Sequence, residues 1–332
     1  MSTFPDMVYH LGGVPVGTRY GWKQGSTSWF VDGDASVTGD GTSPDKPFKT
    51  IYEAVTAASS WDVIYIAPKA WTSGGLWLGT AYQETTDLSL TYAKTGVAVV
   101  GLGHQGIIGQ PYGTVIREKS SSTQPIWKVH APMCAFENIS FEKKSTAVNG
   151  LYFYGDSAGV SEAALGSVYN CHFHGLAGSG ATGDTGGAVY FDACWGATVD
   201  RCSFLGCRIG ISFKSNAGTA GNFIARNNTF LSRLTAASEI SADIYMYAQG
   251  SASCSITHNN CAHLIPSYVG GHARYIIVTA DVRQGLVAFN SVGAVTGTNY
   301  TVGPTGTGII CPANVGHGPN WGNAALLAST TP

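Results

Sequence analysis

Short apolar segments separated by Gly, Asn, Ser and Thr recur through the middle of this chain of 332 residues. Related hexapeptides mark the repeat: FENISF (136–141), VYNCHF (168–173), VDRCSF (199–204), ARNNTF (225–230), THNNCA (257–262) and AFNSVG (288–293). The spacings are 32, 31, 26, 32 and 31 residues when the aligned positions are Asn138, Asn170, Arg201, Asn227, Asn259 and Asn290. A period in this range is typical of a solenoid or another repeat array.

The segments between the hexapeptides favour strands over helices, because they are short and rich in β-branched and aromatic residues. They are 188–191, 209–213, 244–247 and 275–278. Strands one period apart would stack in parallel at roughly 4.8 Å, with Val, Ile, Phe and Cys inside and Ser, Thr and Asn outside. The pattern predicts an all-β fold, a right-handed single-stranded parallel β-helix over residues 63–295. We expect one edge of successive coils to carry Phe141, Phe173, Phe204 and Phe230.

The hydrophobic positions shift by one residue relative to the asparagines after Arg226. An extra residue in one strand would produce such a shift, so we expect a β-bulge there. The period of the repeat survives the shift.

The two ends of the chain lack the period. Residues 28–62 are predicted to form an N-terminal cap with a short helix, in which Thr50 is the N-cap and Glu53 completes a capping box. Residues 296–332, rich in Gly, Thr and Pro, are predicted to form an irregular last coil or a tail. Residues 1–27 form an extended arm whose apolar side chains the solenoid core does not need. We expect the arm to pack on other subunits or a capsid lattice through Met7, Val8, Tyr9, Leu11, Val14 and Val16. The alternative is that it folds back over the N-terminal end of the solenoid.

Charged residues make up 11% of the chain, against roughly 25% in an ordinary globular domain. The net charge of -2 offers no electrostatic attraction for nucleic acid or an anionic membrane. The sequence has no apolar run of about 18 residues and begins without the features of a signal peptide, so we expect a chain made in the cytoplasm. Its eight cysteines are then predicted to be reduced, buried small apolar residues, with Cys171 and Cys202 as neighbours one period apart.

Residues 30–58, FVDGDASVTGDGTSPDKPFKTIYEAVTAA, and the WDVIYIAP that follows soon after resemble the N-terminal cap of pectin-lyase-like β-helix proteins. Tyr82, Glu84 and GVAVVG (96–101) fit the pattern that follows the cap in that family. The resemblance covers about 75 residues and implies the fold, whereas activity differs among members: the fold hosts lyases, hydrolases and inert virion parts. The preceding DMVYHLGGVPVG (6–17) looks like the start of β-helix proteins encoded among tailed-phage virion genes.

Two motifs suggest a cofactor or a metal. GLGHQG (101–106) matches a dinucleotide fingerprint, but residues 107–111 do not start the helix that would receive the pyrophosphate, so we expect a solenoid turn. Four potential zinc ligands lie within ten residues, at Cys254, His258, Cys261 and His263. Alternate residues of a strand point to opposite faces and the Cys-x2-Cys spacing is absent, so we expect buried cysteines and exposed histidines. We predict no cofactor and no metal.

A polysaccharide-cleaving enzyme is the main alternative function. A glycosidase needs two carboxylates about 5 to 10 Å apart. Asp192 with Asp200, near successive strands of one coil, and Asp156 with Asp184 are the candidate catalytic pairs. Polar pairs also arise simply from turns, and only nine acidic residues lie between positions 138 and 290. Some aromatic side chains could equally stack on sugars or pack at subunit contacts: Trp71, Trp77, Tyr152, Tyr154, Trp195 and Tyr247.

These observations predict a non-enzymatic phage virion structural protein that decorates and stabilises the capsid. The reasons are the low charge, the apolar arm, the sparse acids and the phage-like start. A homotrimer is implied by the resemblance to phage β-helix spikes. The expected partners are copies of the chain itself and the major capsid protein or other virion proteins. A cell-surface glycan becomes the partner if the chain is instead a tailspike-like depolymerase or a glycan-binding protein.

Overall fold

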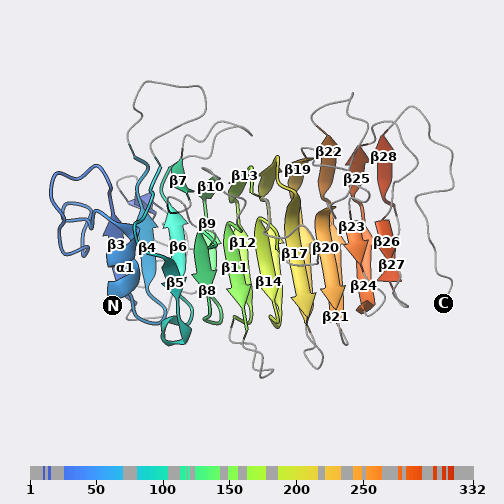
Figure 1. Cartoon of the computed structure of the whole chain (residues 1–332), viewed down its shortest axis with the longest axis horizontal. Coiled ribbons are helices and arrows are strands. Elements are labelled where there is room, and N and C mark those ends of the chain that lie inside the picture. The colour runs from blue at the N-terminus through green and yellow to red at the C-terminus, as the bar shows by residue number, and fades with distance from the viewer. Residues whose placement is uncertain are drawn as a thin grey trace.

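The computed structural model describes residues 10–11, 14–15, 26–69, 81–103, 113–117, 119, 124–142, 149–155, 163–176, 186–215, 221–232, 242–248, 252–263, 276–278, 282–293, 302–304, 309–311 and 313–317. Within these described residues, nearly all of the regular structure is β-strand, with one α-helix and one 3-10 helix, η1 (Tyr92–Lys94). The strands form three long parallel sheets, which we call sheets I, II and III (Figure 1).

Sheet I has ten strands: β3 (Ser28–Val31), β4 (Val63–Ile66), β6 (Ala98–Gly101), β9 (Ala135–Glu137), β12 (Gly166–Tyr169), β15 (Ala197–Asp200), β18 (Asn222–Arg226), β21 (Ala252–Thr257), β24 (Val282–Ala288) and β27 (Ile309–Ile310). Sheet II has eight: β7 (Thr114–Arg117), β10 (Ile139–Glu142), β13 (His172–His174), β16 (Ser203–Leu205), β19 (Thr229–Ser232), β22 (Asn260–His263), β25 (Ser291–Gly293) and β28 (Val315–His317). Sheet III also has eight: β5 (Leu88–Leu90), β8 (Trp127–Val129), β11 (Leu151–Tyr154), β14 (Val189–Asp192), β17 (Ile209–Ser215), β20 (Ala242–Ala248), β23 (Ile276–Val278) and β26 (Val302–Pro304).

The chain visits the sheets in the order III, I, II and repeats that cycle coil after coil, so each strand pairs with the strand one coil away. This arrangement is a parallel β-helix, which confirms the predicted all-β solenoid, and it is consistent with the right-handed crossovers that parallel strands adopt. Figure 1 shows the coils in sequence order along the long axis, from α1 near one end to β28 near the other. Paired strands continue past residue 295, because β26, β27 and β28 add one further coil.

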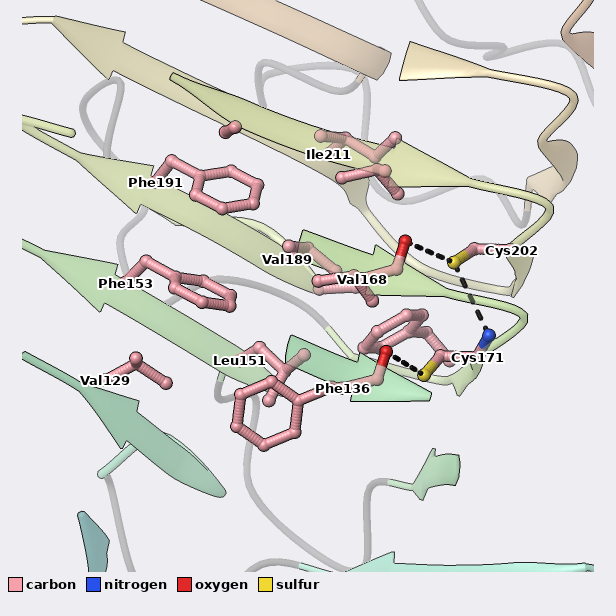
Figure 2. Packing of buried hydrophobic residues seen from close by; sticks show 14 of the residues in the cluster. Val129, Phe136, Leu151, Phe153, Val168, Cys171, Val189, Phe191, Cys202 and Ile211 are labelled. Carbon is pink, nitrogen blue, oxygen red and sulfur yellow. Dashed lines mark hydrogen bonds between the residues drawn. The ribbon is translucent and has the colours of Figure 1, made fainter. Parts of the chain in front are cut away.

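The interior contains continuous stacks of aromatic rings. The predicted column is confirmed: ring centroids lie 5.2 Å apart for Phe141 and Phe173, 5.0 Å for Phe173 and Phe204, and 4.7 Å for Phe204 and Phe230. In-register parallel pairing places identical side chains one above another at about the strand spacing, which suits flat rings. A second stack begins with Phe153 and Phe191, at 4.6 Å (Figure 2). These rings are fully buried and form the centre of the main hydrophobic core.

The turn between sheets I and II explains the shift of the asparagines. One column of this turn has positive φ and contains Asn138, Asn170, Arg201, Asn227, His258, Phe289 and Ala313. The next residue in each coil points inward and forms a second column: Ile139, Cys171, Cys202, Asn228, Asn259, Asn290 and Asn314. The strands β18 and β21 pair in even register from Asn222 to Arg226, so the predicted bulge was wrong. Asn259 and Asn290 instead occupy the second column, whereas Asn138, Asn170 and Asn227 occupy the first.

The N-terminal cap covers the open end of sheet I. Helix α1 (Ile51–Ala57) begins at Thr50, and the predicted capping box with Glu53 is confirmed. The segment that follows β3 covers the outer edge of this strand. The Phe30 N–H donates to the Gly41 carbonyl, and the Phe30 carbonyl accepts from the Phe48 N–H, both at 2.9 Å. Edges satisfied in this way do not pair with other chains.

Buried polar side chains hold the cap onto the first coils. The Asp62 carboxylate accepts from the backbone N–H of Thr27 and Ser59, both at 2.8 Å, and from the Trp29 indole at 2.9 Å. The Glu84 carboxylate accepts the N–H of Ile51 at the start of α1, at 2.9 Å. The Tyr82 hydroxyl accepts from Gly33 and donates to Ala67. Tyr82 and Glu84, both part of the family resemblance, therefore have structural roles in the cap.

The arm contains one described element. Strands β1 (His10–Leu11) and β2 (Val14–Pro15) form a short antiparallel pair, with His10 opposite Pro15 and Leu11 opposite Val14. Met7, Val8, Tyr9 and Val16 lie outside the described residues. Residues 10–15, within the arm that was predicted to be extended, therefore contain a short antiparallel strand pair.

Candidate functional site

The thiols contribute to the core. All eight cysteines are free; seven are buried and Cys311 is half-buried. Cys171 and Cys202 are neighbours inside the solenoid, as predicted, and the Cys171 N–H lies 3.4 Å from Cys202 Sγ (Figure 2). Burial raises the pKa of the Cys134, Cys207 and Cys254 thiols to about 12. Buried thiols with raised pKa values are poor nucleophiles.

The four potential zinc ligands do not gather in the described part of the chain. Cys254 and Cys261 are buried, whereas His258 is exposed and stacks on Phe289 with ring centroids 5.2 Å apart. The side chain of His263 lies outside the described residues. Within the described ranges, no group of three or more His, Cys, Asp or Glu side chains is placed to hold a metal ion.

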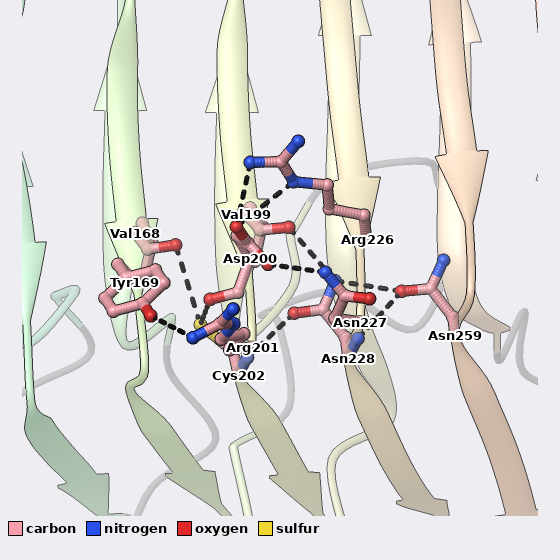
Figure 3. Close-up of polar contacts among 10 residues, drawn as sticks. All are labelled: Val168, Tyr169, Val199, Asp200, Arg201, Cys202, Arg226, Asn227, Asn228 and Asn259. Atoms are coloured by element: carbon pink, nitrogen blue, oxygen red, sulfur yellow. Dashed lines mark hydrogen bonds and ion pairs between the residues drawn. The ribbon is translucent and has the colours of Figure 1, made fainter.

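Asp200 lies at the end of β15 and is fully engaged by neighbouring coils (Figure 3). Its Oδ2 accepts from Arg226 Nε at 3.1 Å and forms an ion pair with Arg226 Nη2 at 3.0 Å. Its Oδ1 accepts from Asn227 Nδ2 at 3.0 Å. The carboxylate side chain is 5% exposed, so both oxygens are directed to protein donors and away from water. This geometry stabilises the turn in which Asn227 has positive φ.

Asp192 lies on a different sheet, at the end of β14 in sheet III. Its Oδ2 accepts from the Tyr152 hydroxyl at 3.1 Å, and its Oδ1 lies 4.0 Å from Lys214 Nζ. About a quarter of each of the Asp192 and Lys214 side chains is exposed, at 24% and 27%. Burial and the Asp192 charge together raise the pKa of Tyr152 above its usual value. Asp192 and Asp200 therefore contact different residues on different sheets.

Aromatic rings surround Asp192 on the outer face of sheet III. Tyr152 stacks on Tyr154 at 5.2 Å and on Tyr190 at 5.1 Å between ring centroids, and His130 stacks on Tyr154 at 4.4 Å. We call Tyr152, Tyr154, Tyr190, Asp192 and Lys214 the tyrosine strip. Burial, and secondarily the nearby Asp192 carboxylate, raise the pKa of Tyr190. The Ser212 hydroxyl, on the adjacent strand, is buried and has no hydrogen-bond partner among the described residues.

The outer face of sheet II carries a second polar group. Glu142 is buried and pairs with Arg117, with Arg117 Nη2 2.7 Å from Glu142 Oε2. His172 Nδ1 lies 2.7 Å from the Ser203 hydroxyl on the next strand. Burial, and secondarily the nearby His174, lower the pKa of His172 to about 4, so its imidazole is neutral at pH 7. Asp156, Glu162, Asp184, Glu239 and Asp281 lie outside the described residues.

Exposed apolar side chains line the corner where sheet III turns into sheet I, and the sequence singled out only one of them, Trp195. Met133, Leu165 and Trp195 are 43%, 47% and 51% exposed. We call these three residues the corner ridge. Backbone hydrogen bonds from Met133 to Ala164 and from Leu165 to Trp195 place them on successive coils. The available signal was an apolar residue just before three consecutive strands of sheet I, at positions the core does not use.

No helix in the described part of the chain is long and apolar enough to cross a membrane; α1 has seven residues. No protein-family model matches the sequence, and no curated protein matches it. Among solved structures, the crystal structure of native GH136 lacto-N-biosidase from Eubacterium ramulus is similar over 88% of this chain and 68% of that chain, with 12% sequence identity and a TM-score of 0.32. A likeness at this level carries no argument about activity.

Proposed function

We propose that this chain is a non-enzymatic structural protein of a tailed-phage virion, a homotrimeric β-helix that decorates and stabilises the capsid. One observation carries the proposal: two carboxylates described along the solenoid are held by structural partners and are nearly inaccessible to solvent. Asp200 is held by Arg226 and Asn227, and Glu142 by Arg117. A glycosidase needs a pair of carboxylates on either side of a bound sugar, with one free to give a proton and the other free to attack or to activate water.

Asp192 is the most exposed of the three carboxylates just described, and it stands without a second acid in its hydrogen-bonded group. Its contacts are Tyr152 and Lys214. These contacts support a structural interpretation of the two acids that the sequence marked as catalytic candidates.

The virion assignment rests on the resemblance of residues 6–17 to the start of phage β-helix proteins and on the scarcity of charge. With 11% charged residues, the chain has the depleted charge of a surface that is covered in an assembly. The apolar arm supplies a segment outside the solenoid for contact with the major capsid protein or other virion proteins.

Two measurements test the proposal. Purified chain, incubated with capsular, lipopolysaccharide and pectic glycans, is expected to release neither reducing ends nor unsaturated products. Antibodies against the chain are expected to label intact virions of the encoding phage at a constant number of copies per particle. Cleavage that disappears in Asp192→Asn or Asp200→Asn would contradict the non-enzymatic assignment, and unlabelled virions would contradict the location.

The tyrosine strip favours a second candidate, passive glycan binding. Neighbouring rings cover the faces of Tyr152 and Tyr154, so a sugar would contact their edges and hydroxyls, and the paired Asp192 and Lys214 offer a hydrogen-bond acceptor and a donor. Retention of wild-type chain on immobilised host glycans, lost in Tyr152→Ala and kept in the sheet I variant Tyr169→Ala, would establish this function. Equal behaviour of both variants would reject it.

A further inference from the structure

We infer that the corner ridge is the seam along which parallel copies of this chain associate. Met133, Leu165 and Trp195 project from three successive coils at the turn before β9, β12 and β15. These strands are consecutive members of sheet I, and in Figure 1 the coils follow one another along the long axis. The ridge therefore runs parallel to the solenoid axis. The inference takes only the number of copies, three, from the proposed function.

The backbone at the ridge makes its apolar residues costly. Met133 and Leu165 have φ values of 60° and 58°, in the left-handed region that bulky residues seldom adopt. The equivalent position one coil later is Gly196, with φ 77°, where no side chain opposes this conformation. Gly or Asn would therefore satisfy the turn better at positions 133 and 165. The solenoid gains only partial burial in return, because nearly half of each residue is exposed.

The ridge makes a continuous apolar surface across coils. The Leu165 N–H donates to both Trp195 and Gly196 at 3.0 Å, and a Cβ atom on Gly196 would lie 2.9 Å from Leu165 Cδ2. Leu165 thus lies against the glycine turn of the next coil, beside Trp195. The backbone bonds of the same corner continue toward the cap, from Gly96 to Pro132 and from Trp61 to Thr95. Trp61 itself has φ 72° and lies over Gly96.

The charge pattern selects a second copy as the occupant. The corner segments 131–136, 163–169 and 193–199 contain no Asp, Glu, Lys or Arg. A surface of this kind is complementary to itself, because two identical corners brought together bury no charge and leave none unpaired. A partner with charged contacts would find no counter-charge along these segments.

A cyclic arrangement brings the same residues together. In a trimer whose axis runs along the corner, each ridge residue meets the same residue of the other two copies, and layers repeat at about 4.8 Å along the axis. Leu165 would then form the middle layer between Met133 and Trp195. Burial in these layers offsets the strain of the left-handed apolar residues.

Analytical ultracentrifugation of the full chain tests the seam. The wild-type chain is expected to sediment at three times its mass of 34.6 kDa. Leu165→Asn combined with Trp195→Ser is expected to raise the dissociation constant by at least about tenfold, because central aromatic and aliphatic anchors dominate interface affinity. Asn tolerates the left-handed conformation, so thermal unfolding of the dissociated variant is expected at the wild-type temperature or higher.

Phe289→Asn is the matched control. Phe289 is also apolar, 52% exposed and left-handed, with φ 57°, but it lies at the turn between sheets I and II. It is expected to leave the sedimentation of the chain unchanged. A wild-type chain that stays monomeric at its highest soluble concentration would overturn the seam, as would a double variant that assembles like the wild type.

Photo-crosslinking locates the contact independently. A benzophenone amino acid at position 165 is expected to give a covalent product between copies, attached within residues 131–199 of the second copy, whereas the same probe at position 289 gives none. A position 165 product in virions that joins only a different protein would overturn self-association at this corner. Neither experiment depends on enzymatic activity or virion labelling, so failure of the seam and failure of the proposed function are separable.

Discussion

The early and late coils of the solenoid use different side chains to hydrogen-bond the same backbone N–H and C=O groups. At the inward position of the turn between sheets I and II, the early coils have Cys171 and Cys202, and the late coils have asparagine. The ladder of asparagines is Asn228, Asn259, Asn290 and Asn314. Both residue types accept a hydrogen bond from the backbone N–H of the column residue one coil earlier. Both also donate to the backbone carbonyl three residues before that earlier residue; Cys202, for example, accepts from Cys171 and donates to Val168.

The lengths of these bonds differ between the two groups of coils. Cys171 N lies 3.4 Å from Cys202 Sγ, and Cys202 Sγ lies 3.6 Å from the Val168 carbonyl. The corresponding bonds of Asn259 are 3.0 Å, from Asn228 N to Oδ1 and from Nδ2 to the Ala225 carbonyl. Each of the first three asparagines also donates a side-chain hydrogen bond to the asparagine of the next coil, such as Asn259 Nδ2 to Asn290 Oδ1 at 3.0 Å. Thiols are weak donors and acceptors, so the cysteine rungs reproduce the pattern with less energy.

Aromatic packing changes in the opposite direction. The Phe141 column ends at Phe230, and its next members are Cys261 and Val292. The early coils therefore combine stacked rings with weak thiol bonds, whereas the late coils combine smaller apolar residues with a strong amide ladder. The comparison indicates that each coil is stabilised by hydrogen bonds to its backbone groups and by packing of its interior. Packing contributes more in the early coils, and hydrogen bonding contributes more in the late coils.

Removal of a central asparagine is expected to have the largest effect. Asn259→Ala leaves the Asn228 N–H and the Ala225 carbonyl buried without partners and breaks the bond to Asn290. We expect a loss of about 3 to 5 kcal/mol in the free energy of unfolding, measured by urea denaturation. Asn260→Ala, one residue away and exposed, is expected to change it by less than about 0.5 kcal/mol. Similar losses in both variants would show that the ladder does not carry the stability of the late coils.

Acid is expected to weaken the early coils specifically. His172 lies next to Cys171 and has a folded pKa of about 4, whereas the corresponding late residues, Asn260 and Ser291, do not titrate. Above the unfolded pKa of about 6.5, neither state is protonated and the group has no effect. As the pH falls from about 6.5 to 4, the unfolded chain gains a proton that the folded chain does not hold, so stability decreases by about 3 kcal/mol.

The measurement is the pH dependence of unfolding in wild type and His172→Asn. The variant is expected to lose less stability between pH 7 and pH 4, and the difference isolates His172 from the nearby His174 and from the paired Glu142 and Arg117. Parallel curves for the two proteins would contradict the lowered pKa.

Much of the fold is readable from the sequence because each coil repeats a local pattern. The period, the Phe141 column, the pairing of Cys171 with Cys202 and the capping box at Thr50 all depend on spacing alone. The shift of the asparagines was assigned to a bulge because Asn suits two adjacent positions for different reasons. At position 227 asparagine tolerates positive φ, whereas at position 259 its side-chain amide forms hydrogen bonds to the neighbouring coils.

The candidate sites were less predictable, because they depend on which coils lie beside each other and which way side chains point. Asp192 and Asp200 are close in sequence, but the intervening turn places them on different sheets, one with Lys214 and the other with Arg226. The corner ridge likewise arises from residues about 30 positions apart, with no shared motif. Contacts of this kind follow from register, which composition does not encode.

Loss of a cysteine rung is expected to be milder than loss of an asparagine rung. Cys202→Ala removes the bond to the Val168 carbonyl and the acceptor of the Cys171 N–H, both of which are long sulfur contacts. We expect about 1 to 2 kcal/mol of destabilisation, from lost packing and weak hydrogen bonds together. A loss as large as that of Asn259→Ala would show that thiol and amide rungs contribute equally and would remove the distinction between the two groups of coils.

The smallest expected effect is a gain, from extending the amide ladder one coil toward the N-terminus. Cys202→Asn would give the Cys171 N–H an oxygen acceptor, offer an N–H to the Val168 carbonyl and join the chain of amides at Asn228, whose Oδ1 already accepts the residue 202 N–H at 2.9 Å. Three hydrogen bonds of the side-chain amide would replace two sulfur contacts, and we expect this to raise the free energy of unfolding by about 0.5 to 1 kcal/mol.

Cys207→Asn is the control for this last variant. Cys207 is also buried, but it lies outside the column, with its sulfur 3.5 Å from the Phe173 carbonyl. An amide there would bury polar groups without partners and is expected to destabilise the chain by more than about 2 kcal/mol. If Cys202→Asn destabilises to the same extent, the early coils lack room for an amide. The thiols would then be required by volume, and their hydrogen bonds would be incidental.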